Sequence, residues 1–280
     1  MRPGIVAGAA ALIAAGPAAA LAAQAPVALK LTELGRGPTV VLVHGLGGAR
    51  LQWMPTARKL MSDHHVVMVD LPAHGESAMP DPFSFDACAA ALDQVLAKQK
   101  PDSTVVVGHG LGGAIALLEA RAHPERMKGL IVIDATLKPP VAIPDQEKRR
   151  FMEYMDANFD DFLKRVYTGI ARDSAEAVAL HARAALVPQP SMRVYFHALF
   201  DLDVAGATRA LKTPLLFVGS SRNWPDTASW TSVARMRGFD DPVLIPARRV
   251  ANSGTQMYAD QPDTLAMVIR QFEAKVMARK

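Results

Sequence analysis

The sequence predicts an α/β fold with a mostly parallel central sheet and helices on both of its faces. Short apolar runs rich in β-branched residues alternate with helix-length segments, as in a doubly wound sheet. The runs expected to form buried strands are 39–43, 66–69, 104–107, 130–133, 215–218 and a weaker one at 243–245. The expected helices include 53–60, 85–99, 111–122 and 264–278. In such sheets ligands bind beyond the carboxyl ends of the strands, so function is expected in the loops that follow them.

One long interval interrupts this alternation. Residues 138–212 contain no strand-like run, only charged and amphipathic helical sequence such as 146–166 and 175–186. An all-helical insertion between two core strands predicts a cap over the strand ends. The chain is therefore divided into a first core part, 26–137, a helical cap, 138–212, and a second core part, 213–280.

The N-terminal segment predicts export. Residues 5–23 carry no charge, follow a single basic Arg2 and end in small residues, which is typical of a bacterial secretory signal peptide over residues 1–25. Left uncleaved, the segment would act as a membrane anchor, although its Gly16-Pro17 pair would break a helix. We expect a periplasmic or secreted protein with no stable membrane span once the signal is removed.

Composition excludes several classes. The 280 residues are 50% hydrophobic and 21% charged, which is typical of a globular protein. The formal net charge of +4 is too small and too dispersed for a nucleic-acid binder. The only cysteine, Cys88, excludes an intramolecular disulfide and sites built from several thiolates. No His-x-x-x-His spacing and no dinucleotide-binding fingerprint occurs, so neither a metal nor a cofactor is expected.

Three loops at predicted strand ends carry recognisable motifs. They read H-G-L-G-G at 44–48, D-L-P-A-H-G-E-S at 70–77 and G-H-G-L-G-G at 108–113. In this order and spacing they resemble the oxyanion loop, the D-x-P-G-H-G-x-S turn and the G-x-S-x-G nucleophile elbow of the α/β-hydrolase superfamily. The resemblance runs from Thr39 to the C-terminus and implies the α/β-hydrolase fold, with a helical cap after the sixth core strand.

The resemblance also implies an oxyanion hole made of backbone groups. The N–H of Leu111, directly after the elbow position, and that of Leu46 in the first loop would donate to a developing oxyanion. His44 is expected to hold its own loop. His109 precedes the elbow position and is expected to point away from it, so a structural role is again the expectation.

The catalytic positions of the family are occupied by other residues. Gly110 stands where the nucleophile is expected, and glycine has no oxygen or sulfur to attack an acyl carbon. Thr255 stands seven residues before Pro262, at the position of the family histidine, and no histidine follows His197. Arg222 replaces the acid after the strand 215–218. These three positions predict a degenerate triad.

Two aspartates are candidates for a replacement acid. Asp226 lies four residues beyond the usual position, but after Pro225 it is more typical of a helix start. Asp134 follows the strand 130–133, where some relatives place their acid and many place a loop-capping residue.

The main functional expectation is a non-catalytic pseudohydrolase that binds a small apolar or acyl-type ligand, or a protein partner. The alternative is an enzyme with a relocated mechanism, a lyase, isomerase or atypical hydrolase, that uses the backbone oxyanion hole. Its base would come from one of six residues: His44, His109, Asp134, His181, His197 or Asp226. An ordinary hydrolase whose catalytic residues the motifs do not reveal is the third interpretation, and the fold by itself does not decide between the three.

Overall fold

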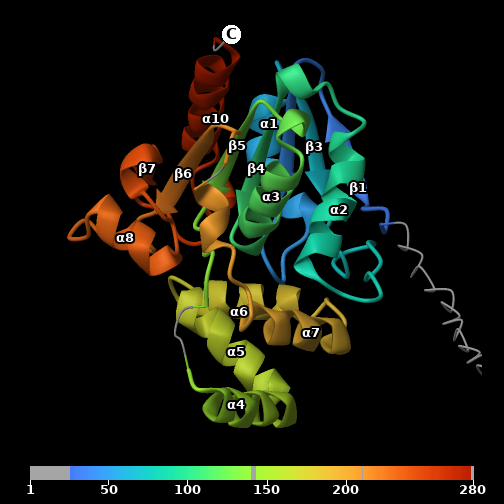
Figure 1. Ribbon diagram of the computed structural model, residues 1–280, viewed down its shortest axis with the longest axis vertical. Coiled ribbons are helices and arrows are strands. Elements are labelled where there is room, and N and C mark those ends of the chain that lie inside the picture. The colour runs from blue at the N-terminus through green and yellow to red at the C-terminus, as the bar shows by residue number, and fades with distance from the viewer. Residues whose placement is uncertain (1–25, 140–142, 210, 279–280) are drawn as a thin grey trace, which may run out of the picture.

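The computed structural model describes residues 26–139, 143–209 and 211–278, and its centre is one seven-stranded sheet (Figure 1). The strand order is β1-β3-β2-β4-β5-β6-β7, with β1 antiparallel to β3 and every other pair parallel. The strands are β1 Leu31–Leu34, β2 Thr39–Val43, β3 His65–Val69, β4 Thr104–His109, β5 Gly129–Ile133, β6 Leu215–Ser220 and β7 Ala247–Val250. The predicted doubly wound, mostly parallel architecture is confirmed.

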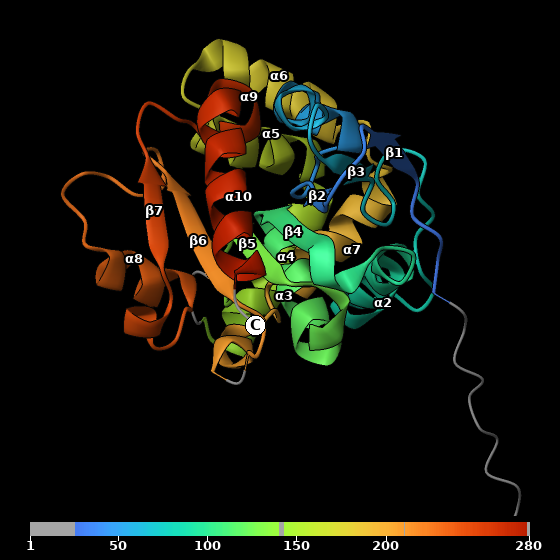
Figure 2. The same cartoon turned by 90° about the horizontal axis from the view of Figure 1, so that it is seen from above.

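Helices cover both faces of this sheet (Figure 2). The helices of the sheet layers are α1 Met54–Leu60, α2 Phe85–Leu96, α3 Leu111–Ala122, α8 Trp230–Arg237, α9 Met257–Asp260 and α10 Pro262–Met277. Helices α2, α3 and α8 contribute to one apolar cluster, and α1 and α10 contribute to a second cluster on the opposite face. Within β2, Val41 and Val43 belong to the first cluster, whereas Val40 and Leu42 belong to the second. Both faces of the strand are buried, which explains its uninterrupted apolar run.

Four further helices lie between β5 and β6 in the chain, beyond the carboxyl ends of the strands (Figure 1). They are α4 Asp145–Ala157, α5 Phe159–Ile170, α6 Ser174–Ala184 and α7 Gln189–Leu199. Their inner faces form a separate apolar cluster that includes Met155, Phe159 and Tyr167, and Leu46 of the sheet layer packs against it. The helical sequence at 146–166 forms two helices, because Asn158 leaves helical geometry with φ −125° and ψ 39°.

The predicted position of the last strand, 243–245, is wrong. Residues Pro242–Leu244 form a 3₁₀ turn instead of the expected strand at 243–245, and Val243 and Leu244 are 91% and 80% exposed. The strand β7 begins three residues after that turn and carries Arg248 and Arg249. It lies at the edge of the sheet, where charged residues are common, so its apolar signal is weak.

The remaining short 3₁₀ segments are Arg50–Trp53, Pro101–Ser103, Pro124–Arg126 and Ala205–Thr208. No helix among the described residues is both long enough and apolar enough to cross a membrane. The predicted signal peptide, residues 1–25, lies outside the described part of the chain.

Candidate active site

The turn between β4 and α3 has the geometry of a nucleophile elbow. Gly110 connects them with φ +52° and ψ −121°, a conformation that costs a residue with a side chain about 1–3 kcal/mol. A Cβ atom placed on Gly110 would meet only the Gly45 Cα, at 3.9 Å. At Gly112, by contrast, a Cβ would lie 2.2 Å from the His44 carbonyl oxygen. The elbow therefore requires glycine at 112 for close packing, whereas position 110 has free space above it.

Two backbone N–H groups face no acceptor at this turn. Within the described ranges, neither the Leu46 N–H nor the Leu111 N–H makes a hydrogen bond. Leu111 is the first residue of α3, where a backbone donor has no partner inside the helix. Both residues line the same cavity, so their donors are available to an oxyanion there.

Two buried histidines fix the oxyanion loop. His44 donates from Nδ1 to the Gly45 carbonyl at 2.7 Å and accepts at Nε2 from the Leu71 N–H at 3.0 Å. His74 donates to the Pro72 carbonyl at 2.8 Å and accepts from the Gly47 N–H at 3.0 Å. Burial lowers the pKa of both rings, that of His74 to about 4, so both are neutral near pH 7. With both ring nitrogens engaged in the loop, His44 is not available as a base.

His109 differs from His44 and His74, because its ring nitrogens have no hydrogen-bond partner. The residue lines the cavity beside Gly110, and both ring nitrogens are buried without a hydrogen-bond partner in the described chain. The ring fits because residue 45 is glycine: a Cβ there would lie 2.8 Å from His109 Nδ1. Tyr258 packs edge-on against it, with ring centroids 5.4 Å apart.

The environment of His109 keeps the imidazole neutral. Burial lowers its pKa below the ordinary value of 6.5, while the nearby Asp134 charge and the Thr255 backbone act in the opposite direction. A neutral imidazole with an unoccupied ring nitrogen can accept a proton from a water molecule or a substrate. No other histidine among the described residues lines this cavity.

Asp134 lies at the end of β5, in the same cavity, with a positive φ of 48°. Its carboxylate accepts hydrogen bonds from the Ser220 N–H at 3.0 Å, from Ser220 Oγ at 2.6 Å and from Asn223 Nδ2 at 2.8 Å. These donors hold the charge in place. Asp134 thus supplies a fixed negative potential near His109 without hydrogen-bonding the ring.

The other candidate residues are dispersed. Thr255 lines the cavity and donates from Oγ1 to the Ile170 carbonyl at 3.0 Å. Arg222 is exposed and donates to the Gly169 carbonyl at 2.9 Å. The Asp226 side chain is 85% exposed and pairs with Arg249 at 2.8 Å, so it does not serve as a displaced acid in the cavity. His197 pairs with Asp156 at 2.9 Å on the cap helices, and neither it nor His181 lines the cavity.

The cavity has a volume of about 370 Å³ and lies between the strand ends and α5–α7. Its apolar wall includes Ile170, Leu180, Leu199 and Leu202. Its polar wall includes Asp134, Thr136, Asn223 and Arg237. Sequence reasoning missed Tyr167, Asn223 and Arg237, because no motif marks residues that reach the site from cap helices or from a distant loop. A larger hollow near the end of α10 contains neither a histidine nor the elbow, and we assign it no chemistry.

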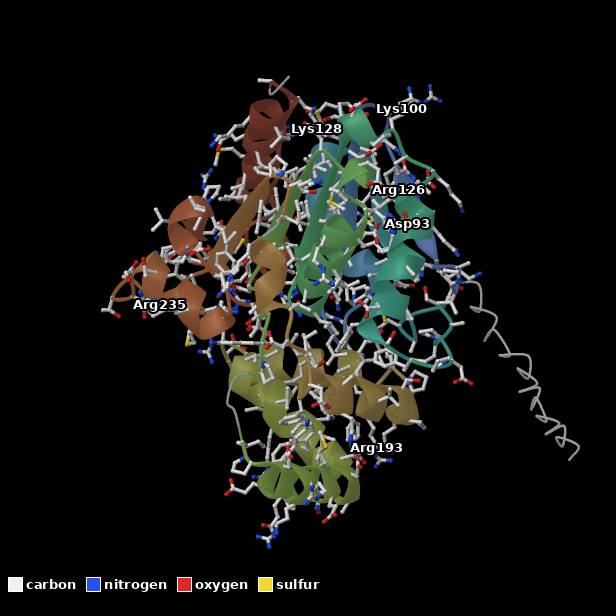
Figure 3. The ribbon with its side chains drawn as sticks, in the orientation of Figure 1. Asp93, Lys100, Arg126, Lys128, Arg193 and Arg235 are labelled. Carbon is white, nitrogen blue, oxygen red and sulfur yellow. The ribbon has the colours of Figure 1, made fainter. Side chains whose placement is uncertain are left out.

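A group of possible metal ligands lies elsewhere. Asp93 of α2 and Glu119 and His123 near the end of α3 bring ligand atoms within 4.8 Å of one another. Arg126 already donates to Asp93 at 2.5 Å (Figure 3). This cation beside the cluster opposes the binding of a second one, and none of these residues lines the cavity.

Tyr167 supports the oxyanion loop from the cap. Its hydroxyl donates to the Leu46 carbonyl at 3.0 Å, and burial raises its pKa, so it remains a donor. We expect Tyr167→Phe to lower kcat for an ester by about tenfold, less than the loss of an oxyanion donor itself, with stability changed by about 1 kcal/mol. Steady-state kinetics and thermal unfolding measure both effects. The control is Tyr154→Phe, whose side chain is exposed on α4, and an unchanged kcat in Tyr167→Phe would remove the supporting role.

The elbow, the oxyanion loop and the cap over the strand ends together define the α/β-hydrolase class. The family model described as alpha/beta hydrolase fold matches residues 38–191, so the chain belongs to this family. Among solved structures, a thermophilic esterase from Thermogutta terrifontis superposes with a TM-score of 0.72 over 90% of this chain and 95% of that one, at 22% identity. That likeness shows the fold.

Curated relatives include pimeloyl-acyl-carrier-protein methyl ester esterases from four bacteria. The chain is 37% identical to the protein of Pseudoalteromonas atlantica over 112 residues, which is 39% of this chain and 42% of the relative. It is 32% identical to that of Aliivibrio salmonicida over 193 residues, which is 65% of this chain and 72% of the relative. The matches span 42%, 37% and 47% of the lengths of the first three curated relatives, less than half in each case.

These relatives overturn the main functional expectation. They are named as methyl ester esterases, which points to catalysis and contradicts the prediction of a non-catalytic pseudohydrolase. The alternative, an enzyme with a relocated mechanism, agrees better with them. The prediction gave most weight to the replaced nucleophile, histidine and acid positions, and the lack of a hydrogen-bond partner for the His109 ring could not be read from the sequence.

Proposed function

We propose that this protein is an ester hydrolase in which water, activated by His109, attacks the substrate directly. One observation carries the proposal: an imidazole with two unpartnered nitrogens shares a cavity with two unpartnered backbone N–H groups. A base and an oxyanion hole in one cavity are the minimum needed for acyl transfer to water.

In this proposed mechanism, the three triad positions of the family hold residues that do not act as nucleophile, histidine and acid. Gly110 has no side chain at the elbow, Thr255 stands at the histidine position and Arg222 at the acid position. A covalent acyl-enzyme intermediate therefore does not form at residue 110. The space above Gly110, where a Cβ has only one neighbour within 4 Å, is proposed to hold the attacking water.

The proposed reaction balances without a cofactor. Neutral His109 takes a proton from the water as its oxygen forms a bond to the ester carbonyl carbon. The Leu46 and Leu111 N–H groups stabilise the negative charge on the former carbonyl oxygen. When the tetrahedral intermediate collapses, the C–O bond to the leaving group breaks and the His109 imidazolium returns its proton to the departing alkoxide. The products are a carboxylic acid and an alcohol, and His109 is neutral again.

The cavity supports a small substrate. Its volume of about 370 Å³ and its apolar wall of leucines and isoleucine support the proposal of a short acyl chain as part of the substrate. No nucleic-acid partner is proposed. Export remains a prediction from residues 1–25.

The proposed water position can be tested by filling it. We expect Gly110→Ala to lower the hydrolysis of p-nitrophenyl butyrate at least tenfold, because the new methyl group occupies the space of the nucleophile while the oxyanion donors remain. The strained φ at this position costs about 1–3 kcal/mol of stability, which thermal unfolding measures. Gly206→Ala is the matched control, since nothing lies within 4 Å of its added Cβ. Full activity in folded Gly110→Ala would place the attacking water elsewhere.

A further inference from the structure

A buried arginine lines the cavity without a carboxylate partner. Arg237 is the last residue of α8, is 9% exposed and faces the cavity together with Thr136 and Asn223. Across the described ranges no Asp or Glu lies within ion-pair distance of its guanidinium. A buried cation without a counter-ion is costly, and burial lowers the pKa of this group, although an arginine remains protonated near neutral pH.

Only one edge of the guanidinium is occupied. Nη1 donates to the Asp134 carbonyl at 2.8 Å and to Thr136 Oγ1 at 3.2 Å, with the Ala135 carbonyl at 3.5 Å. Nε is buried and has no partner, and Nη2 makes no hydrogen bond to any described residue. Nε and Nη2 share the edge that binds a planar carboxylate with two parallel hydrogen bonds.

The Asp134 carboxylate does not form an ion pair with the Nε and Nη2 edge of Arg237. The Asp134 carboxylate is held by Ser220 and Asn223, so its oxygens are directed to those donors. Its charge still lowers the local positive potential. Recognition at Arg237 therefore depends on the free pair of donors more than on net charge.

We propose that Arg237 forms a carboxylate-binding subsite, so that the substrate is an ester whose other end is a carboxylate, such as a half-ester of a short aliphatic dicarboxylic acid. The ester part of this inference rests on the proposed function, whereas the carboxylate subsite does not. The apolar residues Leu199 and Leu202 line the same cavity and suit the methylene chain between the two groups.

Binding tests the subsite without any chemistry. Calorimetry with the unprocessed ligand adipic acid monoamide, compared with hexanamide of similar length, measures the contribution of the carboxylate. We expect the monoamide to bind at least tenfold more tightly to the wild type. Arg237→Gln abolishes this preference, and Arg237→Lys retains part of it, because lysine keeps the charge but not the paired donors. Arg235→Gln keeps the preference, since Arg235 is an exposed cation on the same helix (Figure 3).

Kinetics separates the inference from the proposed function. The wild type should hydrolyse mono-p-nitrophenyl adipate at least tenfold faster, by kcat/KM, than p-nitrophenyl hexanoate, and Arg237→Gln should remove that ratio. Preferential binding without hydrolysis would support the subsite and contradict the ester hydrolase. The subsite would be overturned if this ratio of kcat/KM values were the same in the wild type and in Arg237→Gln. An equal loss of kcat/KM for both substrates gives that unchanged ratio. If Arg237→Gln fails to fold, Arg237→Lys decides by the same ratio.

Discussion

Replacement of His109 by glutamine is expected to lower kcat/KM for p-nitrophenyl esters by about 10²–10⁴-fold, the usual contribution of a general base. Glutamine keeps a planar polar group of similar reach but does not accept a proton near neutral pH. His109 is the only histidine among the described residues that lines the cavity, and both of its ring nitrogens are buried without a hydrogen-bond partner. Initial rates at several substrate concentrations give the ratio of kcat/KM between the wild type and His109→Gln.

His197→Gln is the matched control. His197 lies on α7 of the cap, hydrogen-bonds Asp156 and does not line the cavity, so its loss should leave kcat/KM within about twofold of the wild type. Thermal unfolding of both variants separates a catalytic loss from a folding defect. Wild-type rates in folded His109→Gln would contradict the role of His109 as the base and would show that another group has this role.

The pH profile gives an independent measurement of the same base. Because burial lowers the His109 pKa below 6.5, the neutral form persists into mildly acidic solution. We expect kcat/KM of the wild type to stay flat from about pH 6.5 to 8.5 and to fall only below that range. In His109→Gln this acidic limb should disappear from the residual rate. A limb centred above pH 7 in the wild type would instead indicate a base whose pKa is raised.

The sequence predicted the sheet well, because central parallel strands are buried on both faces and read as continuous apolar runs. It failed at β7, where an edge strand carries Arg248 and Arg249, and at β1, a half-buried strand before the first strong run. The elbow and the oxyanion loop were predictable because close packing requires glycine at defined positions, as Gly112 against the His44 carbonyl shows.

The orientation of His109 was not predictable, because it depends on space left by residues distant in sequence. The missing Cβ of Gly45 and the ring of Tyr258 decide where the imidazole lies. Arg237 illustrates the same limit. Its role follows from which backbone carbonyls occupy one edge of its guanidinium, and no spacing in the sequence encodes that. Motifs locate the loops of a site, whereas tertiary packing decides which side chains are free within it.

The second large effect concerns stability. Glu119→Gln is expected to stabilise the protein by about 3 kcal/mol at pH 7. The Glu119 carboxyl is 1% exposed, and its Oε1 has no partner in the described structure. Burial, reinforced by the nearby Asp93 carboxylate, raises its pKa to about 8, with Glu125 acting in the same direction and Arg126 opposing them. The folded protein therefore holds Glu119 protonated at pH 7, whereas the unfolded chain ionises it.

The pH dependence fixes the sign of this effect. Between the ordinary value of 4.5 and the folded value of about 8, the folded state binds the extra proton, so Glu119 lowers stability as pH rises, by about 1.4 kcal/mol per pH unit. Glutamine has no proton to lose. The two proteins should therefore have similar stability near pH 4 and diverge up to pH 8, and the buried histidines contribute equally to both.

Urea unfolding at pH 4, 6 and 8 measures the divergence. Glu125→Gln is the control, because that carboxylate is 64% exposed and its removal should change stability by less than about 0.5 kcal/mol. All samples contain EDTA, since Asp93, Glu119 and His123 lie close enough to share a metal ion that would favour ionised Glu119. A destabilised Glu119→Gln at pH 8 would show that the carboxylate is ionised in the folded protein and held by Arg126. In that case the end of α3 is stabilised by a charge pair, and its burial does not suppress ionisation.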